Sequence, residues 1–413
     1  MSRLYGRIPQ MSRPFVRAAF WDAVALAFLH GMGLPFYGVV ARRLGAGDGA
    51  MAILAMAPFL GFLGSMRIAR LARHVGWSRL LGYMRLSCCC MLLGFAVTTH
   101  PVLFTLLATV IIAVVSSSTS LTGNLLRGHV RSTFQGDTLK WMRVTTVLTA
   151  VPLTWMAGNL FDVDVATYRI IFPLAGVIAA GTTLFLFRLP RRSMEHAFQR
   201  VAPLRFGEEF HLLKRDRRFG LFLLVFFIGT FAEKMGMPVL PVYFTDVLNL
   251  RYSDVAAALG IAGPLASIGG YFMWSHIARR TGNPLLVLAI CMTLKAIRPA
   301  ALALAMYASQ PVVVVASAEA IFRFMIAGLE IASLLSVLRL APADRTPHYL
   351  GLHFWFMGVR GIMGPIIGWW FLVMNISMSI VFGIITLIVL IGAAGLWLLL
   401  AQAKVQTSSD SVQ

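Results

Sequence analysis

Charged residues that interrupt apolar sequence are the first candidates for chemistry in this chain. In SAEAIFRFMIAGLEIA, Glu319, Arg323 and Glu330 recur at i, i+4 and i+11, which places them on one face of a helix. Glu319 and Arg323 can pair within that helix, whereas Glu330 then needs a partner or a proton. Since a low dielectric disfavours a lone carboxylate, Glu330 suits proton exchange, with a static ion-pair network as the alternative. Its equivalent in an internal repeat is Asn124, in the polar run SSSTSLTGN.

Two further candidates occupy matching positions of that repeat. HGMGLPFYGVV begins at His30, and EKMGMPVLPVY begins at Glu233 and continues with Lys234. Both segments run into glycine and proline, so we expect an interrupted helix in each half of the chain, a pattern typical of a binding site near the membrane midplane. For His30, a histidine satisfied by a neighbouring helix is an equal alternative. If the functional interpretation holds, His30 and Glu233 face one another across a central cavity.

Three more cations could bind an anionic group. His353 and Arg360 lie seven residues apart and therefore share a helix face, and Arg143 lies in another apolar segment. A planar guanidinium suits a carboxylate or a phosphate on a solute, and it suits Glu233 or Glu319 equally well. The sequence leaves these two interpretations open.

The other charges within apolar segments have simpler expectations. We expect Asp22 to pair with Arg143 or to lie near the cytoplasmic surface. Snorkelling toward the membrane surface is the expected explanation for Arg85, whereas Lys295 and Arg298 lie deep enough to need partners.

The elements that must position these residues are membrane-spanning helices. The chain has 413 residues, of which 58% are hydrophobic and 13% charged, with a mean hydropathy of +0.79. Its apolar blocks approach or exceed the roughly 20 residues that cross a bilayer as a helix. The sequence predicts an all-α membrane protein with spans near 18–41, 49–69, 78–98, 101–126, 139–161, 166–188, 219–245, 254–276, 284–307, 311–338, 349–373 and 376–401.

The net charge of +20 reports topology, not a nucleic-acid partner. Outside the spans, most of the 36 lysines and arginines fall on one side of the predicted membrane. The segments on the other side contain Arg42, Arg43, Arg169 and Arg251. By the positive-inside rule both termini are cytoplasmic, and we expect a plasma membrane, or inner membrane in a bacterium.

No enzyme motif, metal site or cofactor is predicted. The adjacent Cys88, Cys89 and Cys90 point about 100° apart on a helix, so they cannot share a metal, and Cys291 also lies in a span. HExxH, a phosphate-binding GxxxxGK[ST] and GxSxG do not occur.

The repeat divides the chain into two halves with six spans each, which makes it a parallel repeat. We expect an N-terminal bundle at 1–188, a cytoplasmic linker at 189–217, a C-terminal bundle at 218–402 and a disordered tail at 403–413.

Over nearly its full length the chain resembles the major facilitator superfamily. The family's loop after span 2, roughly G-x-L-A-D-R-x-G-R-[KR], resembles RLARHVGWSR with Arg73 and Gly76, and its echo after span 8 resembles HIARRTGNP with Arg279 and Gly282. Here arginine replaces the family's aspartate in both loops. GIMGPIIG, from Gly361, resembles a helix-packing element of the family. The resemblance implies two pseudo-symmetric six-helix bundles, a cavity lined by spans 1, 4, 7 and 10, and gating by the two loops.

These observations predict a secondary transporter, not an enzyme, that moves a small charged or zwitterionic solute, weakly favouring an anion, by proton-coupled alternating access. The predicted solute-binding residues are His30, Asn124, Arg143, Lys234, Arg323, His353 and Arg360, and the predicted proton-coupling residues are Glu233, Glu319 and Glu330. The expected partners are the solute, protons and the lipid bilayer, with the chain as a monomer. An exporter of apolar or amphiphilic compounds and a non-transporting receptor or scaffold are the alternatives.

Overall fold

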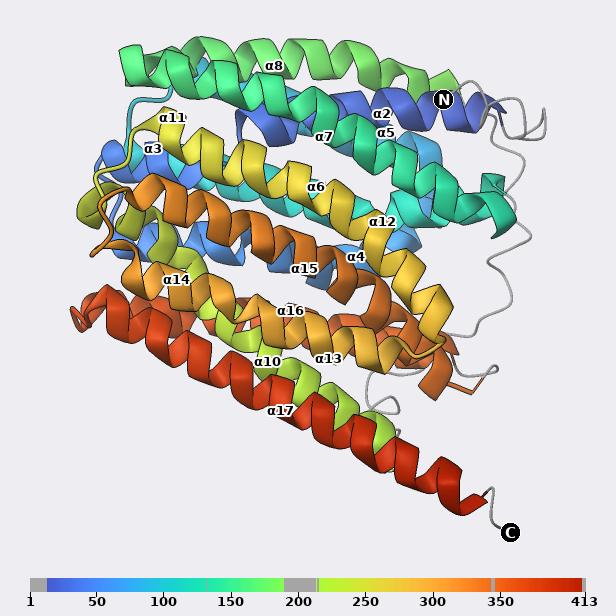
Figure 1. The fold of residues 1–413 in the computed structure, drawn as a ribbon. Coiled ribbons are helices and arrows are strands. Elements are labelled where there is room, and N and C mark those ends of the chain that lie inside the picture. Colours follow the sequence, from blue (N-terminus) through green and yellow to red (C-terminus); the bar gives the residue numbers. More distant parts are fainter. Residues whose placement is uncertain (1–12, 131, 189–212, 214, 343–345, 411–413) are drawn as a thin grey trace. The chain divides into compact units, whose positions relative to one another are not determined.

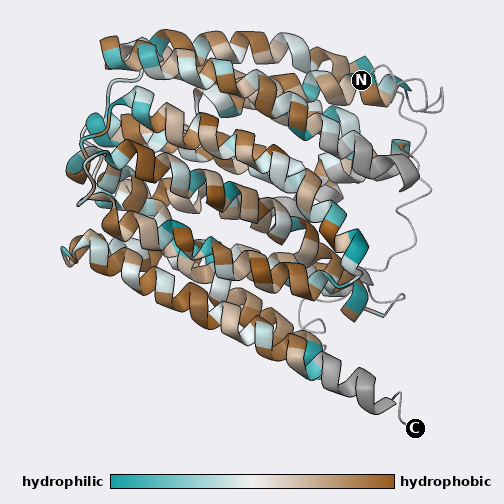
Figure 2. Cartoon of the chain, viewed as in Figure 1, coloured by the Kyte–Doolittle hydropathy of each residue, from teal (hydrophilic) through white to brown (hydrophobic). Residues whose placement is uncertain are grey.

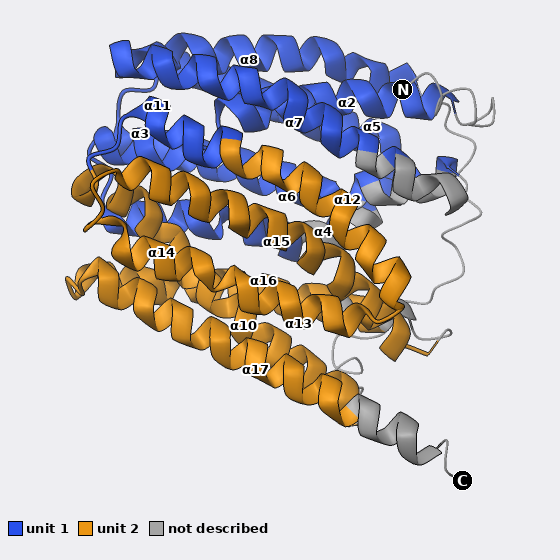
Figure 3. Ribbon diagram, viewed as in Figure 1, with its two compact units in different colours: residues 1–202, 249–261 blue, residues 203–248, 262–413 orange. Residues whose placement is uncertain are grey.

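The computed structural model describes residues 13–130, 132–188, 213, 215–342 and 346–410, and within these ranges it is helical and contains no strand. The predicted linker at 189–217 falls largely outside the described residues. Two compact units are present, and each is described by itself (Figure 3). Unit 1 comprises 1–202 and 249–261, and unit 2 comprises 203–248 and 262–413.

Long helices make up both units (Figure 1). Unit 1 contains α2 (Arg13–Met32), α3 (Tyr37–Arg43), α4 (Asp48–Val75), α5 (Trp77–Leu93), α6 (Pro101–His129), α7 (Ser132–Val163), α8 (Tyr168–Thr183) and the short α11 (Tyr252–Val255). Unit 2 contains α10 (Arg217–Val242), α12 (Gly263–Thr281), α13 (Pro284–Lys295), α14 (Ile297–Ala305), α15 (Pro311–Leu340), α16 (Thr346–Val373) and α17 (Met378–Asp410).

The predicted all-α membrane architecture is confirmed. Among the described residues, 11 helical stretches are long and apolar enough to cross a membrane, and α4 contributes a shorter apolar run at 48–63. Figure 2 shows hydrophobic colour along most of these helices, as expected for helices whose outer faces contact lipid. Together with α4 they account for the predicted spans.

The C-terminal helix is longer than predicted. α17 continues to Asp410, so residues 403–410 are helical where the sequence suggested a disordered tail. The reason is local, because no glycine or proline follows Gly395 to end the helix.

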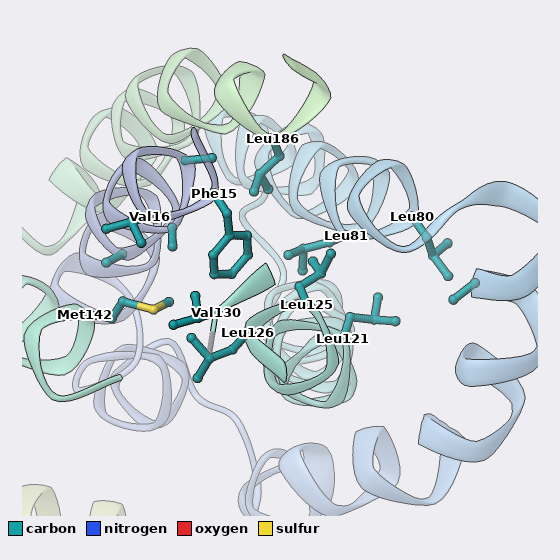
Figure 4. Packing of buried hydrophobic residues seen from close by; sticks show 14 residues of the cluster. Phe15, Val16, Leu80, Leu81, Leu121, Leu125, Leu126, Val130, Met142 and Leu186 are labelled. Carbon is teal, nitrogen blue, oxygen red and sulfur yellow. The ribbon is translucent and has the colours of Figure 1, made fainter. Parts of the chain in front are cut away.

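One end of unit 1 is organised around Phe15 of α2. Figure 4 shows this ring among Leu81, Leu125 and Leu186, which come from α5, α6 and the 3₁₀ turn at 184–188. Between membrane helices, close packing of this kind replaces the hydrophobic driving force that acts in water.

Residues 249–261 belong with unit 1 because α11 docks on α7. The carboxylate of Asp162, near the end of α7, accepts the backbone N–H groups of Tyr252 at 2.7 Å and Ser253 at 3.1 Å. Arg43 donates to the carbonyl of Leu250 at 2.5 Å, and its guanidinium lies 4.0 Å from the ring centroid of Tyr252. The same span then passes through a π-helical stretch at Ala256–Ala262 and enters unit 2 as α12.

In unit 2 the GIMGPIIG segment of α16 packs directly on α10. A Cβ atom at Gly364 would lie 2.5 Å from the Cβ of Lys234, and one at Gly368 would lie 2.0 Å from the carbonyl oxygen of Met235. The predicted role of these glycines in close helix packing is therefore confirmed.

The two predicted helix interruptions differ in outcome. The first span does break, because α2 ends at Met32 and α3 begins at Tyr37. The prediction for the second is wrong at MGMP, because α10 runs through Pro238 and Pro241 to Val242 and gives way only then to a π-helical turn at Tyr243–Val247. Membrane helices tolerate proline where neighbours or local adjustments satisfy the freed carbonyls.

Candidate functional site

A carboxylate held by two lysines lies in the middle of unit 2. Lys234 Nζ donates to Glu233 Oε1 at 2.6 Å, and Lys295 Nζ donates to Glu233 Oε2 at 3.0 Å. Lys295 also donates to the carbonyl of Gly229 at 3.3 Å, and its side chain is 1% exposed. Glu233 and Lys234 come from α10, whereas Lys295 ends α13. The three groups form a buried cluster with an excess of one positive charge.

A second carboxylate repeats this arrangement. Glu319 on α15 pairs through Oε1 with Arg323 Nε at 2.7 Å and through Oε2 with Arg298 Nε at 2.8 Å. The helical spacing predicted the Glu319–Arg323 pair, and this prediction is confirmed. Arg323 is 47% exposed, so the buried carboxylate connects to an accessible cation.

Lys295 and Arg298, which were expected to need partners deep in the membrane, each form an ion pair with a carboxylate. Both residues come from the stretch α13–α14, and each crosses to a carboxylate of another helix, Glu233 or Glu319. The sequence indicated the need for partners but not their identity. Neither residue was among the predicted site residues, although a charge deep in an apolar span was the available signal.

Residues from both carboxylate clusters line a small cavity. Glu233, Lys295 and Arg298 line its polar side, and Leu302, Phe382 and other apolar residues line the rest. It is large enough for a water molecule, which would have polar partners in both clusters.

Glu330 makes no ion pair with either cluster among the described residues, although it lies close enough to Arg323 to interact with it electrostatically. Tyr271 of α12 donates its hydroxyl to Glu330 Oε2 at 2.5 Å, and Glu330 is exposed. Among the described residues no cation lies within ion-pair distance of this carboxylate. Glu330 is thus the least compensated of the three predicted proton-coupling residues.

Arg360 and His353 line one face of α16, as their spacing predicted. Arg360 donates through Nη1 to the hydroxyl oxygen of Thr230 on α10, and its guanidinium lies 5.2 Å from the ring centroid of Phe226. The His353 ring lies 5.4 Å from the same phenyl ring. Both side chains are buried, and Arg360 Nε and His353 Nδ1 have no hydrogen-bond partner among the described residues.

Comparison by sequence finds nothing: no family model matches this chain, and no curated protein matches it. Solved structures do match. A variant of the nucleoside transporter NupG has a TM-score of 0.73 at 11% identity, covering 93% of this chain and 98% of that chain. A POT family transporter in complex with a thioalcohol-conjugated peptide has a TM-score of 0.69 at 13% identity, covering 98% and 99%. The xylose transporter XylE from E. coli has a TM-score of 0.64 at 14% identity, covering 94% and 96%.

The chain has the major facilitator superfamily fold. At these identities the likeness establishes the fold alone. The fold therefore does not identify the solute, and any inference about it must come from the residues of this chain.

The predicted site residues of unit 1 are less connected. His30 is half-buried on α2, whose next residue, Gly31, accepts a hydrogen bond at 2.7 Å from Thr154 of α7. Arg143 is exposed on α7. The side chains of Asn124 and Arg73 lie outside the described residues. The predicted approach of His30 to Glu233 stays a prediction.

Two expectations for unit 1 are wrong. Arg85 does not snorkel, because its side chain is 2% exposed and donates from Nε to Asp22 Oδ1 at 3.0 Å and from Nη1 to Ser118 at 2.7 Å. Asp22, 1% exposed, therefore pairs with Arg85 and lies neither against Arg143 nor at the surface. The cause is rotation of the two helices about their axes, which turns both charges into the bundle, where an unpaired charge would be very costly.

The two loop glycines adopt backbone conformations that suit glycine. Gly76 ends α4 with φ of +97° and Gly282 ends α12 with φ of +58°, a region that other residues rarely adopt. Arg279 is exposed in the last turn of α12. The gating role of these loops stays a prediction.

Proposed function

We propose that this protein is a secondary transporter that carries a small charged or zwitterionic solute, with a preference for anions, by proton-coupled alternating access. In this proposal the chain works as a monomer and the halves of the fold rock around a site near the midplane. His30, Asn124, Arg143, Lys234, Arg323, His353 and Arg360 contact the solute, and the loops with Arg73, Gly76, Arg279 and Gly282 accompany gating.

The observation that carries the proposal is the excess of positive charge inside unit 2. Its network contains the carboxylates of Glu233 and Glu319, and these meet four cations at ion-pair distance, of which Arg323 is 47% exposed and the others are largely buried. Arg360 adds a fifth cation, close enough to Lys234 and Glu233 to interact electrostatically. Burying unbalanced charge is expensive, so a fold that maintains it favours an anionic partner that arrives from outside.

Glu330 supports the proton-coupled part of the proposal. Glu233 and Glu319 each make ion pairs with two cations, whereas Glu330 makes none among the described residues and accepts a hydrogen bond from Tyr271. A carboxylate with so little compensation is the best candidate to gain and lose a proton as its surroundings change.

The fold neighbours are consistent with transport but do not select a solute. They are a nucleoside transporter, a transporter in complex with a conjugated peptide and a xylose transporter, and these solutes share no charged group. The preference for an anion therefore rests on the charges of this chain.

The orientation in the proposal places both termini and the 189–217 segment in the cytoplasm. Cysteines introduced into that segment should resist a membrane-impermeant maleimide applied to intact cells. Labelling from outside would reverse the orientation.

A two-step experiment tests the function. The purified protein is screened by thermal shift against small anions, zwitterions and apolar compounds, because a ligand of the folded state raises its apparent stability. Compounds that stabilise it are then tested for counterflow in proteoliposomes. Counterflow of an anion or zwitterion supports the proposal, stabilisation without movement favours a receptor or scaffold, and movement of apolar compounds alone favours the exporter.

A further inference from the structure

The buried guanidinium of Arg360 has no ion-pair partner in the part of the chain that the structure describes. Among the described residues no carboxylate lies within ion-pair distance of it. Glu233 interacts with Arg360 electrostatically, but both carboxylate oxygens of Glu233 already accept from lysines. A charge that is 5% exposed in a membrane helix is normally paired, so this position is incomplete.

The neighbours of Arg360 do not balance its charge. Thr230 offers only a neutral hydroxyl oxygen, and its own proton goes to the carbonyl of Phe226 at 2.5 Å. The ring of Phe226 contributes its electron-rich face, which attracts a cation weakly compared with a carboxylate. The Nε of Arg360 is left buried with no acceptor, which costs free energy until one arrives.

A second orphaned nitrogen lies on the same wall. His353 is 3% exposed and lies two helical turns before Arg360. Its Nδ1 has no hydrogen-bond partner among the described residues, and its ring lies 5.4 Å from the ring of Phe226. Both Arg360 and Thr230 lie near the middle of their helices, α16 and α10. The site is therefore as deep in the membrane domain as a solute site is expected to be.

We propose that a small monoanionic group binds to Arg360 between α10 and α16, with Thr230, Phe226 and His353 as the surrounding wall. A carboxylate suits the planar guanidinium, and a halide suits a single buried Nε–H. The group comes either from the solute, in which case this inference rests on the proposed function, or from a free anion such as chloride. Because Arg360 is so little exposed, the anion enters when the α10–α16 contact loosens at Gly364, one turn from Arg360.

The test compares anions at constant ionic strength on the full-length purified protein. Thermal unfolding is measured in chloride, formate or acetate, with gluconate as the bulky reference anion. The broadening of the chloride NMR line is measured in parallel. Wild type should melt several degrees higher in at least one small anion than in gluconate, and Arg360→Gln should lose this difference. The matched control is Asp22→Asn/Arg85→Gln, which removes a buried arginine together with its own partner in unit 1 and should keep the difference.

The chloride and carboxylate measurements distinguish a free anion from an anionic group of the solute. Stabilisation and line broadening by chloride assign the site to a free anion, whereas stabilisation by carboxylates without a chloride effect assigns it to the solute. An anion effect that survives in Arg360→Gln, or its absence in wild type for every anion, overturns the proposal.

If Arg360→Gln does not fold, Arg360→Lys decides, since it keeps the charge but loses Nε and should bind about tenfold more weakly. Unchanged affinity in Arg360→Lys would contradict the site. Counterflow of wild type is scored separately, so the site and the transport function can fail independently.

Discussion

In unit 1 one buried carboxylate, Asp22, meets one buried guanidinium, Arg85, and Ser118 takes a further donor of that arginine. In unit 2 the carboxylates of Glu233 and Glu319 each meet two cations, and Arg360 has none of the described carboxylates within ion-pair distance. The first arrangement is neutral, although the buried Asp22 Oδ2 has no hydrogen-bond partner among the described residues. The second is positively charged, and in our proposal an anion from outside completes it. Buried charge in the same fold can thus serve stability in one unit and binding in the other.

The largest expected effect is in unit 1. Arg85→Gln leaves the carboxylate of Asp22 buried without a cation and should lower the free energy of unfolding by about 3–5 kcal/mol. Asp22→Asn/Arg85→Gln removes both charges and should recover most of that loss. Thermal unfolding in detergent measures both variants. If Arg85→Gln is as stable as wild type, the Asp22–Arg85 pair is dispensable for stability. The contrast between a stabilising pair in unit 1 and a binding cluster in unit 2 would then fail.

A smaller loss of stability is expected in unit 2. In Lys295→Gln, Glu233 keeps Lys234, so the free energy of unfolding should fall by about 1–3 kcal/mol, less than in Arg85→Gln. Transport of a solute found by screening should fall far more than stability does, because the charge balance of the site changes. If Lys295→Gln destabilises as much as Arg85→Gln and leaves transport intact, the Glu233 cluster is structural.

The capping contact that joins α11 to unit 1 should have a modest effect. Asp162→Asn keeps one acceptor for the N–H groups of Tyr252 and Ser253 but loses the negative charge and the second oxygen. The expected loss is about 0.5–2 kcal/mol. Hydrogen exchange at the amides of Tyr252 and Ser253 should accelerate, and unchanged exchange at both would show that this cap does not hold α11.

The smallest effect on stability, within about 0.5 kcal/mol, is expected for Glu330→Gln, since the amide oxygen can still accept from Tyr271. Its effect on transport should be selective. Accumulation driven by a pH gradient should stop, while exchange at equal solute concentrations continues, because exchange needs only the loaded carrier to reorient. If accumulation survives, coupling rests on Glu233 or Glu319, or the proton-coupled mechanism is abandoned.

The sequence predicts the membrane helices well because composition and length decide them. It also predicts contacts within one helix, such as Glu319–Arg323, because the 3.6-residue period fixes them. Contacts between helices depend on how each helix is rotated about its axis, and no local pattern encodes that rotation. For this reason the sequence mispredicts the snorkelling of Arg85 and the partner of Asp22, and it does not identify the partners of Lys295 and Arg298.

The assignment of 249–261 to unit 1 was missed for a similar reason. It depends on a carboxylate of α7, Asp162, which is distant in sequence from the amides of Tyr252 and Ser253 that it caps. In span 7, proline and glycine predict a break in the helix, but α10 continues through both prolines. A membrane helix tolerates proline and glycine without breaking, so these residues permit a break but do not require one.

The most direct test of the central claim is a titration of one anion, the best one found by screening, into three proteins by calorimetry. Wild type and Asp22→Asn/Arg85→Gln should bind with similar affinity, and Lys234→Gln should bind at least tenfold more weakly, because it removes a cation from the charged cluster of unit 2. Equal affinity in wild type and Lys234→Gln, together with weakened binding in Asp22→Asn/Arg85→Gln, would place the binding site in unit 1 and contradict the account.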